Sequence, residues 1–279
     1  MKNNGLIKMK TLFVIITLLV TTNLWAESVD LKYYRSKELY NQGAAHCQKL
    51  LLKTTDKQKR KEILIELAAC YHFNTRDQTY QEAVETYQQL IKEYPSDPLC
   101  ARFYFYIGRC YDAFSRNRPQ DIDKAHKAYR ACFEKYPESQ WADQAYLWLA
   151  NSYIFKSSIK NAKMSAETFE GFLKRYPKSM LVGIAHSQLS ELYCAWLKDY
   201  VATVKHSEAA LAWGIENVNL RRLHLYRLGY VYQYKLNNIP KSLQWYKQLI
   251  TESPTQSDPN YFVVVKRVRE LEAELEGAK

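Results

Sequence analysis

The stretch Tyr94-Pro95-Ser96 recurs as Tyr136-Pro137-Glu138-Ser139 and again as Tyr176-Pro177-Lys178-Ser179. The prolines of this phrase are 42 and then 40 residues apart, and Pro254 follows 77 residues after the third copy. Proline ends a helix because it lacks an amide hydrogen and restricts the residue before it. Helix ends at a fixed interval therefore indicate a repeated unit of about 40 residues.

A second pattern keeps step with the first. It consists of a large apolar residue, a small residue, two variable residues and a tyrosine. Five copies occur, at intervals of 40, 42, 40 and 39: Leu67–Tyr71, Ile107–Tyr111, Leu149–Tyr153, Leu189–Tyr193 and Leu228–Tyr232. Five copies in register predict a row of similar helices.

A third pattern is counted back from each proline. Eight residues before it stand aromatic residues, namely Tyr87, Tyr129, Phe169 and Tyr246. Twelve residues before it stand small residues, namely Ala83, Ala125, Ser165 and Ser242. Residues four apart share one face of a helix, so we expect the small residue to admit a neighbouring helix and the ring to fill the space beside it.

These residues resemble the tetratricopeptide repeat, whose usual period is about 34 residues. The resemblance covers roughly residues 56–255, and the YP-x-S helix end is similar to bacterial periplasmic members of the BamD and CpoB kinds. It implies an all-α fold, an α-solenoid of about five helical hairpins with a lead helix and a C-terminal capping helix.

The expected layout follows from the three patterns. The lead segment covers residues 27–56, with a helix over about Ser36–Lys53, and the repeat solenoid covers 57–255. The hairpins are expected at about 57–95, 98–137, 139–177, 179–217 and 219–254. The capping helix is expected within 256–279, from about Asp258. The fourth hairpin is degenerate because Ala209 stands where the others carry a ring, which predicts a smaller contact or a local change of curvature.

The first 26 residues have the order of a secretory signal peptide. Three lysines precede the apolar run Thr11–Val20, and the segment ends at Ala26. We expect cleavage near Ala26 and a periplasmic or secreted protein, with an uncleaved membrane anchor as the alternative. No cysteine lies between the apolar run and Ala26, so a lipoprotein attachment point is missing. Loss of the segment lowers the formal net charge from +11 to +8. The remaining positive charge favours binding of anionic partners, or it is only a solvated basic surface that binds nothing.

The six cysteines contain no CxxC and no zinc-like grouping with histidine. We expect them to be small core residues at helix contacts, with a Cys100–Cys132 disulfide as the alternative.

No catalytic sequence motif is present, and the histidines are dispersed. Glu138-Ser139 lies in the repeated turn, so it indicates turn chemistry rather than a Glu-Ser catalytic pair. The sequence therefore predicts a protein that is not an enzyme and uses no metal or cofactor.

The resemblance places function on the concave groove lined by the first helix of each hairpin. The positions that it implies are Arg102, Phe105, Arg109, Asp112, Gln144, Leu147, Asn151, Ile154, Ile184, Ser187, Glu191, Cys194, Leu223, Tyr226, Tyr230 and Gln233. Asn151 matches the frequent groove asparagine of the family, whose amide can hold a peptide backbone, and Arg109 could pair with a carboxylate.

The expected function is an exported scaffold that binds protein or peptide segments of envelope proteins in cell-envelope or outer-membrane assembly. Peripheral association with a membrane complex fits this expectation, and binding of nucleic acid does not. Two alternatives remain: a structural homo-oligomer of the envelope, and a BamD-like assembly factor for outer-membrane proteins. The oligomeric state is open, and a partner could instead use the convex face or the termini.

Overall fold

The computed structural model describes residues 37–77, 79–113, 120–155, 158–252 and 261–277. These residues form helices and connecting turns, with no strand among them, so the fold is all-α as predicted. The predicted signal segment 1–26 lies outside the described residues. Within them, no helix has the length and apolar character to cross a membrane. The chain divides into two compact units, Met1–Thr79 and Tyr80–Lys279.

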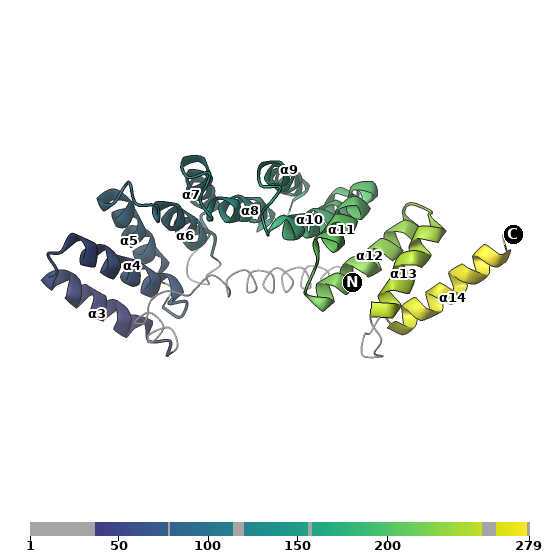
Figure 1. Ribbon diagram of the computed structural model, residues 1–279, viewed down its shortest axis with the longest axis horizontal. Coiled ribbons are helices and arrows are strands. Elements are labelled where there is room, and N and C mark those ends of the chain that lie inside the picture. The colour runs from purple at the N-terminus through teal and green to yellow at the C-terminus, as the bar shows by residue number, and fades with distance from the viewer. Residues whose placement is uncertain (1–36, 78, 114–119, 156–157, 253–260, 278–279) are drawn as a thin grey trace. The chain divides into compact units, whose positions relative to one another are not determined.

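The first unit contains helices α3 (Tyr40–Lys53) and α4 (Lys57–Phe73), which pack against each other (Figure 1). The lead helix thus begins at Tyr40, four residues later than expected. Helix α4 begins where predicted because the Asp56 carboxylate accepts a hydrogen bond from the Lys59 amide at 2.7 Å. The expected first hairpin has α4 in this unit and its second helix, α5, in the next.

In the second unit, each helix packs against the one that follows it (Figure 1). These helices are α5 (Tyr80–Glu93), α6 (Cys100–Asp112), α7 (Ile122–Lys135), α8 (Ala142–Ser152), α9 (Ile159–Arg175), α10 (Val182–Leu192), α11 (Tyr200–Trp213), α12 (Val218–Tyr234), α13 (Ile239–Glu252) and α14 (Tyr261–Gly277). A 3₁₀ turn, Tyr153–Phe155, extends α8, and a π-helical turn, Tyr193–Leu197, extends α10.

The repeated Tyr-Pro phrase forms one kind of turn. In two copies, the Ser139 and Ser179 hydroxyls accept hydrogen bonds from the amides two residues later, at 3.2 and 3.1 Å. In the first copy this position is Asp97 rather than Ser96, and its carboxylate accepts from the Leu99 amide at 2.8 Å. The side chain two positions after each proline therefore closes the turn before the next helix.

The repeat patterns predicted from sequence meet each other inside the hairpins. A Cβ atom on Gly108 would lie 2.4 Å from the Tyr129 ring, and one on Gly229 would lie 2.4 Å from the Tyr246 ring. In the last hairpin, the Ser242 hydroxyl also donates to the Gly229 carbonyl at 2.8 Å. The small residue of the first helix therefore leaves the space that the aromatic ring of the second helix occupies.

The fourth hairpin lacks this ring, and a polar contact stands in its place. The Ser190 and Ser207 hydroxyls lie 2.6 Å apart, and both side chains are fully buried. The π-helical turn follows in the same hairpin and ends at Lys198, which has a left-handed backbone (φ 57°). The hairpin in which Ala209 predicted a smaller contact thus also contains the buried Ser190–Ser207 hydrogen bond.

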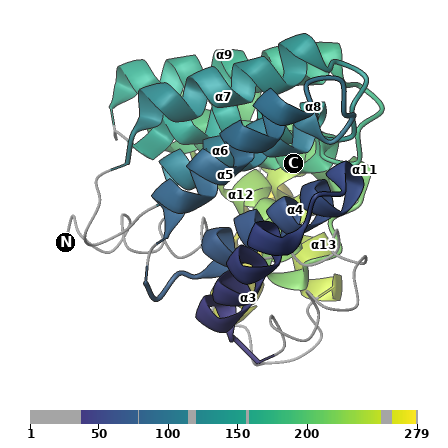
Figure 2. The ribbon, with the colours of Figure 1, turned by 90° about the vertical axis from the view of Figure 1, so that its left-hand side faces the viewer.

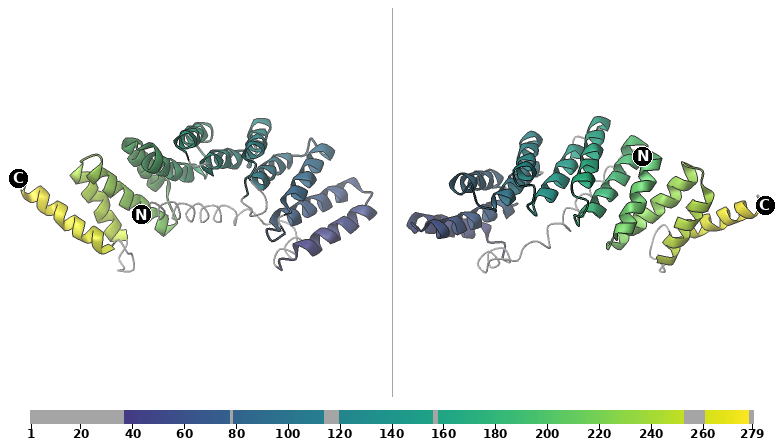
Figure 3. Two further views of the ribbon diagram at one scale, coloured as in Figure 1. Left: turned by 180° about the vertical axis from the view of Figure 1, so that it is seen from behind. Right: turned by 45° about the horizontal axis from the view of Figure 1, so that its top comes forward.

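Helices α7 and α9 lie side by side on one side of α6, α8 and α10 (Figures 1, 2 and 3). The Arg175 guanidinium at the end of α9 donates to the Phe133 carbonyl of α7 at 3.0 Å. First helices also contact one another, since α6 packs on α8. From α6 to α10 the second unit is therefore layered, with the first helices in one layer and the second helices α7 and α9 in the other.

Candidate functional site

The positions implied for the groove lie on α6, α8, α10 and α12 and on the turns that extend α8 and α10. We call the surface made by these sixteen residues, Arg102 to Gln233, the first-helix face. The structure tests where each side chain lies, and it separates those that pack inside the unit from those that reach the surface.

Two arginines of α6 lie over aromatic rings. The Arg102 guanidinium carbon is 5.5 Å from the Tyr106 ring centroid and 5.7 Å from that of Trp141. The Arg109 guanidinium carbon lies 3.4 Å from the Trp148 ring centroid, and its side chain is 19% exposed. Cation–π contacts of this kind hold a guanidinium in place at a partly desolvated surface.

Arg109 also pairs with Asp112, one helical turn away, at 3.3 Å. The Tyr129 hydroxyl of α7 donates to the Asp112 carboxylate, whose side chain is almost fully buried. Burial raises the pKa of Asp112, and the charge of Arg109 and the Tyr129 hydrogen bond offset part of that rise. Asp112 is therefore an internal partner that fixes Arg109.

Several predicted positions belong to the core. Phe105 is 6% exposed and packs its ring against Tyr106, Tyr129 and Trp141. Gln144, Leu147 and Ile154, from α8 and its extension, are each at most 9% exposed. These side chains support the surface residues from within the core and expose little area to a partner.

Asn151, near the end of α8, is 5% exposed, and its Oδ1 atom has no hydrogen-bond partner among the described residues. Buried polar groups almost always have a partner, because an unsatisfied one costs about 1–3 kcal/mol. Asn151 thus holds an acceptor that the hairpins leave unused. It lies three residues after Trp148, the ring that carries Arg109.

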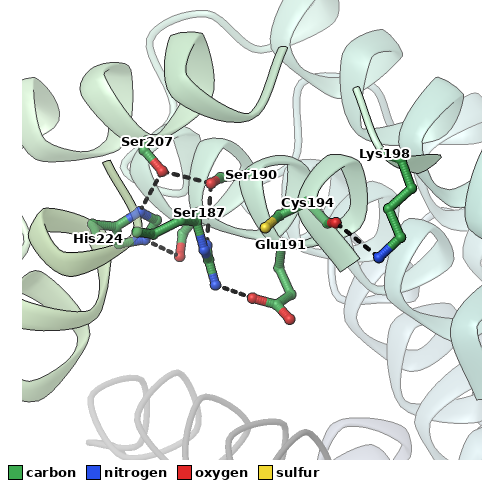
Figure 4. Close-up of polar contacts among 8 residues, drawn as sticks. Ser187, Ser190, Glu191, Cys194, Lys198, Ser207 and His224 are labelled. Atoms are coloured by element: carbon green, nitrogen blue, oxygen red, sulfur yellow. Dashed lines mark hydrogen bonds and ion pairs between the residues drawn. The ribbon is translucent and has the colours of Figure 1, made fainter. Parts of the chain in front are cut away.

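Glu191 of α10 forms an ion pair with Arg227 of α12, as Figure 4 shows. Arg227 also donates to the Ser190 hydroxyl at 3.1 Å. Beside this pair, the Ser187 hydroxyl lies 2.8 Å from Nε2 of His224, and the Ser207 hydroxyl lies 3.1 Å from its Nδ1. Glu191 is therefore engaged in joining two first helices.

The Ser187–His224 contact has the distance of a nucleophile and base, but its surroundings differ from those of a catalytic pair. Ser187 is 6% exposed and His224 is fully buried, so a substrate has little access. Burial and the charge of Arg227 lower the pKa of His224 to about 3. His224 also meets a serine where a carboxylate would orient a catalytic base. The contact joins helices.

Three tyrosines form a ladder along α12. The ring centroids of Tyr226 and Tyr230 are 6.5 Å apart, and those of Tyr230 and Tyr234 are 4.9 Å apart. Tyr230 is 39% exposed and Tyr234 is 46% exposed. Arg267 of α14 lies over the Tyr234 ring at 5.4 Å. Of the predicted positions, Tyr230 has the most accessible ring.

Sequence reasoning missed three contributors to this face. Tyr234 continues the four-residue spacing of Tyr226 and Tyr230, so the aromatic period could have found it. Trp148 and Arg227 precede the small landmark residues Ala150 and Gly229 by two positions. That shared position could have suggested a common role, but their contacts depend on neighbouring hairpins and carry no local signal.

Comparison with known proteins matches part of this chain to a repeat family. The family model of the tetratricopeptide repeat matches residues 64–97, 103–139 and 144–179. The cell division coordinator CpoB of Pseudomonas putida is 36% identical over 67 residues, which are 24% of this chain and 23% of that protein. This chain therefore spans about a quarter of the curated relative that it matches.

Solved structures share the fold at low identity. BtubC from P. vanneervenii has a TM-score of 0.54 at 16% identity, covering 90% of this chain and 94% of that one. Pseudomonas aeruginosa pilF has a TM-score of 0.51 at 14% identity, covering 88% and 94%. The three matched repeats show that residues 64–179 carry tetratricopeptide repeats, and the neighbours share the fold of stacked helical hairpins.

Proposed function

We propose that the first-helix face on α6 and α8 binds a peptide segment of a partner protein. The observation that carries this proposal is the unsatisfied Oδ1 of Asn151. Once the partner displaces the side chains that cover this buried atom, its backbone amide would donate to Oδ1 and remove the desolvation penalty. Arg102 and Arg109, held over rings of Tyr106, Trp141 and Trp148, add positive charge for carboxylates of the partner.

The partner is proposed to be an envelope protein, met after export and cleavage near Ala26. Support comes from the order of residues 1–26 and from the 67-residue similarity to a protein named for cell division. An exported homo-oligomer and a BamD-like role in outer-membrane protein assembly are the alternatives. Cell fractionation tests the location, and recovery in the cytoplasm would remove the envelope from the proposal.

Asn151→Ala is the decisive variant because it removes an acceptor that makes no internal hydrogen bond. We expect thermal stability to be unchanged or slightly raised, and capture of partners from a membrane-solubilised lysate to fall. Arg109→Ala is a weaker test alone, since it leaves Asp112 buried beside Tyr129 without its cation. The double variant measures the combined loss.

The matched control is Lys127→Ala with Lys163→Ala, two exposed positions on the second helices α7 and α9. Proteins that wild type and this control recover, but the Asn151 variant does not, are the ligands of the face. Recovery of outer-membrane barrels would favour assembly, division or wall proteins would favour coordination, and self-association alone would favour the oligomer. If the Asn151 variant and the double variant recover the same partners as wild type at the same level, the proposal is overturned. The binding surface would then be sought on the convex face or the termini.

A further inference from the structure

The contact between α3 and α4 contains two cysteines, one from each helix. Cys47 and Cys70 belong to one core cluster with Ala44 and Leu67, and their exposed fractions are 2% and 3%. On α3 the neighbours Gly43 and Ala44 are small and buried, and the larger side chains of Leu51, Ile63, Leu67 and Tyr71 complete the cluster. Small residues let two helices approach closely, which a disulfide between their backbones requires.

The Cys70 side chain lies in the same cluster as Cys47 and helps to raise the pKa of its thiol, and the Cys47 sulfur lies 3.8 Å from the Glu66 carboxylate. Other buried cysteines have different partners. The Cys100 thiol donates to the Tyr94 carbonyl at 3.2 Å, and the Cys132 thiol donates to the Ala101 carbonyl at 3.1 Å. Cys100 and Cys132 are free thiols in the described part of the chain, so the bridge considered from sequence is absent there, whereas Cys47 and Cys70 share one core cluster.

We propose that Cys47 and Cys70 are a modification site, which a disulfide-bearing oxidant converts into a covalent link between α3 and α4. One thiolate attacks the oxidant's sulfur and releases one thiol from it. The second thiolate then attacks the mixed disulfide and releases the other. Each cysteine gives up one proton and one electron, the Sγ–Sγ bond forms, and the oxidant's S–S bond breaks into two thiols.

The surroundings of Cys47 determine when this reaction occurs. The Cys70 thiol, burial and the Glu66 carboxylate all raise the pKa of the Cys47 thiol. Thiolate is therefore scarce in the folded protein, and the exchange is slow there. Oxidation belongs to folding or to local opening of α3, when both thiols reach solvent. Once formed, the bridge closes a loop of about 24 residues and restricts the unfolded chain.

The test refolds the full-length reduced protein in oxidised glutathione. We expect one intramolecular disulfide that joins the tryptic peptides 38–49 and 62–76, which carry Cys47 and Cys70. We also expect the oxidised protein to unfold at a midpoint several degrees higher than the reduced protein. Intact, folded protein should oxidise more slowly, and Glu66→Gln should speed that reaction by removing the carboxylate beside Cys47.

Cys132→Ser is the matched control, because it removes a buried cysteine outside the pair and should leave the cross-linked peptide and the midpoint shift in place. Cys47→Ser should abolish both. Full alkylation of Cys47 and Cys70 after refolding in oxidised glutathione would overturn the proposal, and so would a bridge to any other cysteine. These readouts need no partner protein, so they stand apart from tests of the first-helix face.

Discussion

At the scale of single residues, the repeat is a set of matched pairs between first and second helices. Gly108 faces Tyr129, and Gly229 faces Tyr246, each with no room for a methyl group. In the third hairpin the first-helix residue is Ala150, and the Ser165 hydroxyl donates to its carbonyl at 2.7 Å. The size of the small residue sets how closely its partner approaches.

Gly229→Ala should therefore destabilise the fifth hairpin. Overpacking a core costs about 1–3 kcal/mol, and alanine returns about 1 kcal/mol of helix propensity relative to glycine. The expected net loss is up to about 2 kcal/mol in the free energy of unfolding, measured by urea denaturation. Gly277→Ala, where a Cβ meets nothing within 4 Å, is the control. A Gly229 variant as stable as this control would show that the Tyr246 ring moves aside at no cost.

How much could be predicted differs between these residues. Tyr129 and Gly108 recur at fixed counts from other landmarks, so the sequence placed both at repeat positions, but their contact with each other was not predicted. The pairing of Glu191 with Arg227 was not predictable, because it depends on the rotation of α10 against α12 across an intervening helix. Phe105 has the spacing of a groove residue, but its large ring is buried by Trp141, which comes from the next hairpin.

At the scale of elements, the fourth hairpin replaces ring packing with a buried polar network. The missing ring was predictable from Ala209, but the polar network that replaces it was not, because its residues come from three helices. They are Ser187 and Ser190 of α10, Ser207 of α11 and His224 of α12 (Figure 4). A second histidine contact, between Nδ1 atoms of His186 and His206, lies 2.8 Å across the same hairpin. Such networks specify one arrangement when every member is satisfied.

This network should make the protein acid-sensitive. Burial and Arg227 hold the pKa of His224 at about 3 in the folded state, whereas an unfolded histidine titrates near 6.5. Above pH 6.5 both states are neutral and stability is unaffected. Below it only the unfolded state gains the proton, so the free energy of unfolding falls, by about 2 kcal/mol at pH 5. His186, whose pKa burial lowers to about 4, adds a smaller loss because it is partly exposed.

Urea denaturation at pH 7.5 and 5.0 measures this loss. His224→Gln can still bond Ser187 and Ser207 but takes up no proton, so its stability should fall less between the two pH values. His46→Gln, on the exposed side of α3, is the control for removing one histidine. If the His224 variant loses as much stability in acid as wild type, the acid sensitivity lies elsewhere.

At the scale of the whole molecule, the periodic landmarks predicted the order of the helices and the positions of most of their ends. The expected hairpin 139–177 contains α8 and α9, and 219–254 contains α12 and α13. The division after Thr79 was not predicted. The landmarks Leu67–Tyr71 and Tyr87 keep the same spacing as in other hairpins, so nothing in the repeat signals that α4 groups with α3.

The C-terminal helix gives the last prediction, because a solenoid is held together by contacts between neighbours. Val264, Val268 and Leu271 of α14 share a core cluster with Leu225 of α12 and with Tyr246 and Leu249 of α13. Leu271→Asp buries a carboxylate in this cluster, which should undock α14 and destabilise the end of the unit by several kcal/mol. Hydrogen exchange should rise across 218–252 and stay unchanged across 100–135, which does not contact α14.

Ala273→Asp, exposed on the same helix, should leave both segments protected. Equal loss of protection in both segments would mean that the unit unfolds as one cooperative block, and no loss in either would mean that α14 contributes nothing to the stack.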